Sequence, residues 1–234
     1  MTSLAALFLM SALVQDVEAT KPVPRDANWT KRHDGFVEIA KKGGVDFLLL
    51  GDSITDGWRN FDAKTKRGGK NVWDKTFEPL KAANFGIGGD RTQHVLWRIQ
   101  HGELDGIQPK AAVLMIGTNN TGADSAEDIA DGVGAIVKTI QQKSPKTKVL
   151  LLAIFPRGKM IPNPQNSKIL EINKMLVKLD NGKSVKYLDI GSKFMKDGQI
   201  PDAIMYDHLH LTEEGYQIWA NAILPDVNAM LGKK

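Results

Sequence analysis

Five short apolar runs alternate with helix-like segments, and this alternation constrains the fold more than any other feature of the chain. An apolar run without polar interruptions is typical of a strand that is buried on both faces. Such strands occur in parallel sheets that helices cover on both sides, so we predict an α/β fold with a five-stranded parallel sheet. The five runs span residues 45–50, 82–85, 111–116, 149–154 and 185–188.

Helix signals follow several of these runs. Asp90 and Ser125 each stand where a helix cap is expected, and Ser125 has Asp128 three residues later. Thr212 is predicted to begin the last helix, and Pro225 is predicted to kink or break it. Apolar residues then recur at helical spacing, at Val95, Leu96 and Ile99, at Ile129, Val133, Ile136, Val137 and Ile140, and at Ile169, Ile172, Leu176 and Leu179.

Composition limits the function classes that the chain can belong to. With 234 residues, of which 42% are hydrophobic, the chain is long enough for one well-cored domain, which we assign to residues 20–234. The net charge is +4, but the basic residues are scattered and form no stripe with aromatic residues, so we expect no nucleic-acid partner. There is no cysteine, which excludes disulfides, a thiol nucleophile and cysteine-bound metals.

The N-terminus has the pattern of an export signal. Residues 4–14 form an apolar run, and Ala19 supplies a small residue at a cleavage site, so residues 1–19 are predicted to be a signal peptide. The run is too short to span a bilayer, so stable membrane insertion is not expected. A packed N-terminal helix is the alternative, but the run lacks amphipathic periodicity. We therefore expect a secreted or periplasmic protein.

Three polar motifs follow the first three predicted strands. Ser53 lies in Gly-Asp-Ser after the first strand, Gly89 in Gly-Gly-Asp after the second, and Asn119 in Gly-Thr-Asn after the third. In parallel sheets, functional sites form beyond the carboxyl ends of the strands. We therefore expect Ser53, Gly89 and Asn119 to meet at one edge of the sheet.

These residues, together with the later Asp-His-Leu-His motif, supply the parts of an ester-hydrolysing site. Ser53 is the candidate nucleophile, and His210 is the candidate base because histidine titrates near neutrality. Asp207 can orient the histidine ring. The main-chain N–H groups of Ser53 and Gly89 and the side-chain amide of Asn119 are candidate oxyanion donors. Each motif alone also fits a turn or a helix cap, but chemistry explains the set of four better than packing does.

The same residues resemble the four sequence blocks of the SGNH, or GDSL, hydrolases. The Ser, Gly, Asn and His for which that family is named fall on Ser53, Gly89, Asn119 and His210. A closer likeness is to the catalytic subunits of intracellular platelet-activating-factor acetylhydrolase. The segments that carry it are 84–90, 94–98, 117–120, 155–158 and 207–212.

The resemblance implies a flavodoxin-like, three-layer α/β/α fold and ester hydrolysis without a metal or other cofactor. Its members remove acetyl and other short acyl groups from lipids, polysaccharides and small esters, and a homodimer is compatible with it. We therefore predict a serine esterase, and we expect Ile54 and Leu209, which flank the candidate catalytic residues, to border the acyl group. Specificity is expected to depend on residues 54–76 and 156–164.

Two alternatives stay open at this point. Asp207, His208 and His210 could instead be ligands of a metal-dependent hydrolase, because residues two apart on an extended segment face the same side. The chain could also be a carbohydrate-binding protein that keeps the scaffold without turnover. The sequence assigns no role to Arg157 or to the tryptophans, which are Trp29, Trp58, Trp73, Trp97 and Trp219.

Overall fold

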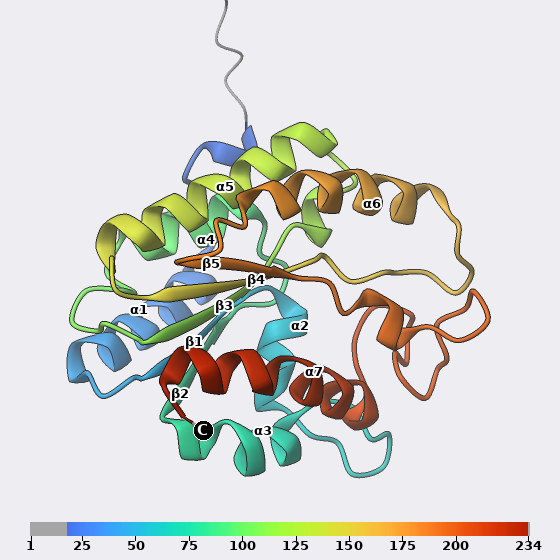
Figure 1. Ribbon diagram of the computed structural model, residues 1–234, viewed down its shortest axis with the longest axis horizontal. Helices are drawn as coiled ribbons and strands as arrows, with labels where there is room; N and C mark the ends of the chain where they lie inside the picture. The colour runs from blue at the N-terminus through green and yellow to red at the C-terminus, as the bar shows by residue number, and fades with distance from the viewer. Residues whose placement is uncertain (1–17, 234) are drawn as a thin grey trace, which may run out of the picture.

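The computed structural model describes residues 18–233, which form three layers around a five-stranded parallel sheet (Figure 1). The strand order is β2-β1-β3-β4-β5, and every neighbouring pair is parallel. This confirms the predicted architecture, and no predicted strand end differs from the observed one by more than two residues. The strands are β1 Phe47–Gly51, β2 Ala82–Gly86, β3 Ala111–Met115, β4 Lys148–Leu152 and β5 Val185–Leu188.

Helices cover both faces of the sheet (Figure 1). On one face lie α1 (Ala27–Lys42), α4 (Thr92–Gln100), α5 (Ala126–Lys143) and α6 (Pro164–Leu176). On the other lie α3 (Lys70–Thr76) and α7 (Glu213–Leu231), and the short α2 (Ser53–Asp56) leads from β1 into that layer. Single 3-10 turns occur at Glu18–Thr20, Gly57–Arg59, Glu78–Leu80, Thr118–Asn120, Val177–Leu179 and Gly191–Phe194.

The central strand β1 shows why its sequence is apolar throughout. Leu48 and Leu50 point into the core beneath α1, α4, α5 and α6, whereas Phe47 and Leu49 point into the core beneath α3 and α7. All four side chains are at most 1% exposed. Burial of each side chain contributes roughly 1.5–3 kcal/mol. Both faces of the strand therefore require apolar residues.

Two of the predicted helix starts are confirmed, one needs correction, and the helix break allowed for at Pro225 does not occur. Ser125 accepts a hydrogen bond from the Asp128 N–H, and Thr212 caps α7. Asp90 does not cap α4, which begins at Thr92, because its carboxylate is fully buried and bound to cationic side chains instead. Pro225 does not break α7, which continues to its C-terminal end at Leu231.

The topology brings the first three predicted motifs together. Gly51 at the end of β1 pairs with Gly86 of β2 on one side and with Met115 of β3 on the other. The chain leaves β1 toward one edge of the sheet and later returns to β3, so the carboxyl ends of β1 and β3 form the switch point where open sheets bind ligands. The motifs that follow these strands must therefore meet there.

The predicted signal peptide lies largely outside the described residues, so it remains a prediction. Its last two residues, Glu18 and Ala19, form a 3-10 turn with Thr20, and Ala19 is buried. The Thr92 hydroxyl donates a hydrogen bond of 2.8 Å to the Ala19 carbonyl. Across residues 18–233, none of the helices has the length and apolar character needed to cross a membrane.

Candidate active site

Ser53 occupies the first position of α2, directly after β1. The Asp52 carboxylate caps this helix by accepting a 2.9 Å hydrogen bond from the Ile54 N–H. The preceding Gly51 has no room for a side chain, because a Cβ there would lie 2.5 Å from the Met115 carbonyl oxygen. The resulting tight turn presents the serine hydroxyl beyond the carboxyl end of the sheet.

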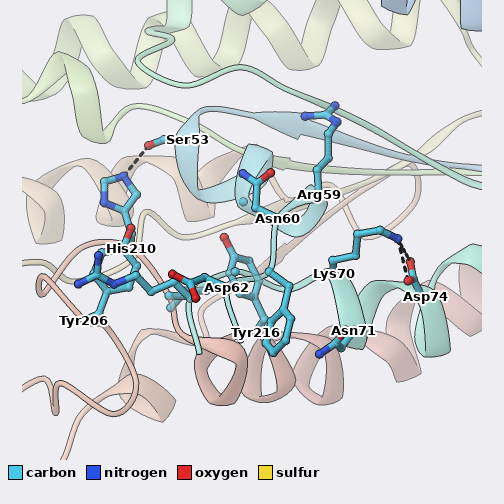
Figure 2. A pocket seen from close by; sticks show the side chains of 15 residues that line it. Ser53, Arg59, Asn60, Asp62, Lys70, Asn71, Asp74, Tyr206, His210 and Tyr216 are labelled. Carbon is cyan, nitrogen blue, oxygen red and sulfur yellow. Dashed lines mark hydrogen bonds and ion pairs between the residues drawn. The ribbon is translucent and has the colours of Figure 1, made fainter. Parts of the chain in front are cut away.

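His210 and Asp207 complete a hydrogen-bonded series with this serine, and Figure 2 shows its Ser53–His210 contact. Ser53 Oγ lies 2.9 Å from His210 Nε2, and His210 Nδ1 lies 2.7 Å from Asp207 Oδ2. The other oxygen of Asp207 accepts the N–H groups of His210 and Leu209, at 2.7 and 3.1 Å. Nucleophile, base and orienting carboxylate are therefore in contact although Ser53 and Asp207 lie 154 positions apart in the sequence.

The Asp207 carboxylate is held in its ionised form. Partial burial would raise its pKa, but the hydrogen bonds from the His210 N–H and ring and from the Leu209 N–H outweigh that effect and lower the pKa below its ordinary value. An ionised carboxylate at this position stabilises the imidazolium that forms when His210 takes a proton.

A tight turn carries the candidate donor Gly89. The Asp90 N–H donates to the Ile87 carbonyl at 3.2 Å, which closes the turn, and Gly89 has φ +78°. A value near +80° belongs to the third residue of a type II turn, where glycine is favoured because it lacks a Cβ. Among the described residues, the Gly89 N–H donates to no acceptor, so it remains available to a ligand.

Asn119 supplies a side-chain amide beside this turn. It lies in the 3-10 turn that follows β3, and its Nδ2 donates a 2.8 Å hydrogen bond to the Asp90 carbonyl. An amide nitrogen carries two hydrogens, so this bond orients the group and leaves the second hydrogen for an oxyanion. Arg157 supports the 3-10 turn that carries Asn119, because the Arg157 Nη1 lies 3.3 Å from the Thr118 carbonyl oxygen and 3.2 Å from the Thr118 hydroxyl.

The geometry does not favour a metal site at the Asp207 motif. Both ring nitrogens of His210 are already engaged, one by Ser53 and the other by Asp207. The neighbouring His208 has φ +57° and places Nε2 at 3.4 Å from Asp202. In the part of the chain that the structure describes, no three His, Cys, Asp or Glu side chains are grouped as metal ligands.

A cleft of about 610 Å³ extends from Ser53 and His210 toward α3 (Figure 2). Most of its lining side chains are polar or charged. Ten of the fifteen lining residues belong to residues 57–74, within the segment that was expected to govern specificity. The lining residues are Ser53, Gly57, Arg59, Asn60, Phe61, Asp62, Arg67, Gly68, Lys70, Asn71, Asp74, Tyr206, His210, Leu211 and Tyr216.

Residues 57–69 form a loop that is closed at its base. The Gly69 N–H donates to the Gly57 carbonyl at 3.0 Å, so the two ends of the loop meet. The same loop is tied to the segment that carries His210, because the Glu213 N–H donates to the Lys66 carbonyl at 2.8 Å. The loop therefore forms one wall of the cleft in a fixed position relative to the candidate base.

The structure does not place Ile54 or Leu209 in this cleft. The Ile54 side chain is 1% exposed and packs into the core beneath α7, where Trp58 is also buried. Leu209 is partly buried against the same core. Neither residue lines this cleft, so their expected contact with the acyl group stays a prediction.

Two cleft residues had no sequence signal. The Tyr206 ring stacks on His210 with 6.0 Å between ring centres and 20° between ring planes. The Arg67 guanidinium lies 4.1 Å from the centre of the Tyr206 ring, within the range of a cation–π contact. Neither residue belongs to a motif, and they lie 139 positions apart (206 − 67).

Behind the candidate oxyanion donors lies a buried network of charges. Arg98 is fully buried, with Nε 2.9 Å from Asp90 and Nη1 2.5 Å from Glu103. The two carboxylates outweigh the effect of burial and raise the Arg98 pKa, so this side chain stays cationic. Burial raises the pKa of Asp90 despite these partners. The same cause raises the pKa of the neighbouring Asp52 to about 7.

A serine, histidine and aspartate in contact at the switch point of a parallel sheet, with two candidate oxyanion donors on the neighbouring loops, define a class of enzyme. That class is the carboxylic ester hydrolases of the GDSL, or SGNH, type. The comparison with known families gives the same answer. The chain belongs to the GDSL-like Lipase/Acylhydrolase family, whose model matches residues 49–218.

One relative in sequence agrees with this assignment, and two solved structures have a similar fold. Platelet-activating factor acetylhydrolase IB subunit alpha2 of Rattus norvegicus is 40% identical over 200 residues, which cover 85% of this chain and 82% of the rat protein. A GDSL-like lipase of Bacteroides thetaiotaomicron has a similar structure, with a TM-score of 0.66 and 16% identity. The match covers 86% of this chain and 96% of the lipase chain. A variant of Axe2, an acetylxylan esterase of Geobacillus stearothermophilus, also has a similar structure. Its TM-score is 0.61 at 17% identity, and the match covers 82% of this chain and 96% of the Axe2 chain.

Proposed function

We propose that the protein is a serine esterase that removes acetyl or other short acyl groups through an acyl-enzyme. The observation that carries this proposal is the 2.9 Å contact between Ser53 Oγ and His210 Nε2, with Asp207 behind the histidine. A serine hydroxyl becomes a nucleophile only when a base takes its proton. The contact places the base where that transfer needs it.

The residues of the site account for each step of the reaction. His210 takes the Ser53 proton as Oγ attacks the ester carbonyl, and the tetrahedral oxyanion receives hydrogen bonds from the Ser53 and Gly89 N–H groups and the Asn119 amide. As the carbon–oxygen bond to the alcohol breaks, His210 gives that proton to the departing oxygen. Water, deprotonated by the same histidine, then attacks the acyl-enzyme; the bond between the acyl carbon and Ser53 Oγ breaks, Oγ takes the proton back from His210, and the carboxylic acid leaves.

The lining of the cleft supports a polar alcohol portion in the substrate. Asn60, Asp62, Lys70, Asn71 and Asp74 offer donors and acceptors in the space next to Ser53. Hydroxyl-rich or charged groups, such as a sugar or a lipid headgroup, can satisfy them, whereas an alkyl chain cannot. The names of two relatives, an acetylhydrolase and an acetylxylan esterase, support acetyl as the acyl group.

Export is a separate part of the proposal. It is supported by the apolar run at residues 4–14 and the small residue Ala19. A secreted or periplasmic esterase would meet acylated polysaccharides and small esters outside the cytoplasm. Fractionation of cells that express the full chain, followed by N-terminal sequencing of the exported protein, tests this part; a protein that stays in the cytoplasm with residues 1–19 attached would refute it.

The central experiment measures p-nitrophenyl acetate hydrolysis by the wild type and by Ser53→Ala, with and without a chelator. Ser167→Ala is the matched control, because Ser167 is exposed on α6 and does not line the cleft. We expect loss of activity only in Ser53→Ala, by roughly 10⁴-fold or more, and no effect of the chelator.

Other outcomes identify the competing functions. Activity that survives in Ser53→Ala and disappears with the chelator would show a metal-dependent hydrolase. Sugar binding by a wild type that cleaves no ester would show a binding protein on this scaffold. His210→Ala provides a second check, because it should lose activity to a similar extent while the far-UV circular dichroism spectrum stays unchanged.

A further inference from the structure

The peptide group between Gly88 and Gly89 can adopt two opposite orientations, and the two glycines favour neither of them. Glycine adopts positive and negative φ with similar ease, so a Gly-Gly turn can rotate its central peptide by half a turn at low cost. The C=O and N–H groups of one trans peptide point in opposite directions. Rotation would therefore reverse the direction of the Gly89 N–H and leave a carbonyl oxygen in its place.

Arg25 holds this peptide from the side of the carbonyl. Its Nη1 donates a 2.8 Å hydrogen bond to the Gly88 oxygen. An ideal Cβ on Gly89 would lie 3.3 Å from the same guanidinium, so Arg25 covers this side of the turn. The hydrogen bond is available only while the Gly88 carbonyl faces Arg25, and in that orientation the Gly89 N–H points to the opposite side.

We propose that Arg25 is a positioning residue that keeps the Gly89 N–H directed at the oxyanion. The inference rests on the proposed function, in which that N–H is one of the donors. A cationic donor on the carbonyl also polarises the peptide and so strengthens its N–H as a hydrogen-bond donor. Arg25 thus acts on the reaction through Gly89.

Arg25 is itself fixed by the buried carboxylate of Asp90. The Arg25 Nη1 lies 3.1 Å from Asp90 Oδ1, which also accepts a 2.7 Å hydrogen bond from the Trp29 indole. Arg98 binds the second oxygen of the same carboxylate. The Arg25 side chain is 29% exposed, so it is anchored by these contacts and still reaches solvent.

The other N–H groups of the turn are also fixed by protein acceptors. The Ile87 N–H donates to the Gly51 carbonyl at 3.3 Å, and the Gly88 N–H donates to Asp56 at 3.2 Å. The Asp90 N–H closes the turn. Within residues 18–233, Gly89 therefore has the one N–H of this turn without an acceptor, and Arg25 holds the peptide to which it belongs.

The test compares Arg25→Met, Arg25→Lys and the control Lys31→Met, which removes an exposed cation from the same N-terminal region. Initial rates with p-nitrophenyl acetate give kcat and KM, and a trifluoromethyl ketone that forms an oxyanion on the serine gives an inhibition constant. For Arg25→Met we expect kcat to fall about 10- to 100-fold with KM changed less than threefold. The ketone should bind more weakly by about the same factor as the loss in kcat/KM.

The variants also separate positioning from a general structural role. Arg25→Lys keeps a cationic donor and should recover part of kcat, whereas Lys31→Met should match the wild type, and all variants should melt within a few degrees of it. If Arg25→Met fails to fold, Arg25→Gln, which keeps an uncharged donor, replaces it.

Three results would overturn the inference. The first is an Arg25→Met variant with unchanged kcat and KM. The second is a raised KM at unchanged kcat in that variant, which would show that Arg25 binds the substrate directly. The third is a lower kcat in that variant while the ketone binds as tightly as it does to the wild type. Failure of the proposed function would look different, because Ser53→Ala would then retain activity whatever residue stands at position 25.

Discussion

The side-chain amide of Asn119 donates its hydrogen bond to the main-chain carbonyl of Asp90, at 2.8 Å. The carboxylate of the same Asp90 binds Arg25 and Arg98. One residue therefore orients the Asn119 donor through its backbone and supports the Gly89 turn through its side chain. The Asn119 amide and the Gly89 N–H are therefore held in a fixed position relative to each other, because both depend on the buried Asp90.

Asn119→Ala should remove one oxyanion donor and leave the other two in place. Loss of one such donor costs about 2.7–4 kcal/mol of transition-state stabilisation, so we expect kcat to fall by about 10²- to 10³-fold with KM little changed. Steady-state kinetics on a short acyl ester measures both constants. A rise in KM at constant kcat would mean that Asn119 binds the ground state and does not serve the oxyanion.

Arg98→Met should destabilise the fold strongly. It removes the buried cation that pairs with both Asp90 and Glu103, and breaking a buried ion pair in this way costs about 3–5 kcal/mol. Urea denaturation followed by tryptophan fluorescence measures the free energy of unfolding. The control Lys41→Met breaks an exposed pair with Glu38 and should change that free energy by less than about 1 kcal/mol; equal losses in the two variants would contradict the prediction.

The buried Asp52 should make stability depend on pH. Its pKa is about 7 in the folded protein, raised by burial from 3.8, so between about pH 4 and pH 7 the folded state binds more protons than the unfolded state. The stabilisation from the protonated carboxyl is complete below pH 4 and is lost as pH rises through 7, by at most about 1.4 kcal/mol per pH unit.

Asp52→Asn removes this titration and can keep the cap on the Ile54 N–H. The free energy of unfolding of the wild type minus that of Asp52→Asn should therefore decrease from pH 4.5 to pH 7 and level off above it. Urea titrations at half-unit pH steps measure the difference, in which other titrating groups cancel. A difference that stays constant over this range would show that Asp52 ionises normally in the folded protein.

Acetate esters should be cleaved faster than octanoate esters. Phe61 and Leu211 are the aliphatic or phenyl side chains that line the cleft, and the remaining lining is glycine, tyrosine or other polar groups. A long acyl chain would then gain little of the roughly 0.8 kcal/mol that each buried CH₂ group can contribute. A series of p-nitrophenyl esters from C2 to C8 measures kcat/KM. A steady increase with chain length would reveal an apolar acyl site elsewhere.

The sheet and the meeting of the motifs could be predicted because their signals are local. A strand buried on both faces leaves an uninterrupted apolar run, as at Leu48, Leu49 and Leu50. The rule that sites form at the carboxyl ends of parallel strands then brings Ser53 and Asn119 together without knowledge of any side-chain contact.

The supporting residues could not be predicted because their roles depend on distant partners. Asp90 has the sequence context of a helix cap, and only its burial against Arg98 gives it a different role. A buried arginine such as Arg98 has no sequence feature that separates it from a solvated one. Arg25 lies 63 positions from the Gly88 carbonyl that it binds. The continuation of α7 through Pro225 likewise reflects the packing of Trp219 and Val227 on either side of the proline.

The loop at residues 57–69 has an evolutionary consequence because its base is closed by Gly57 and Gly69. Such a loop can lengthen, shorten or change composition without moving the strand ends, since doubling its length costs only about 0.6 kcal/mol of closure entropy. The loop contributes much of the cleft wall but none of the three candidate catalytic residues. Insertions and exchanges within one short stretch of the gene can therefore supply new substrate preferences while the reaction itself is inherited intact.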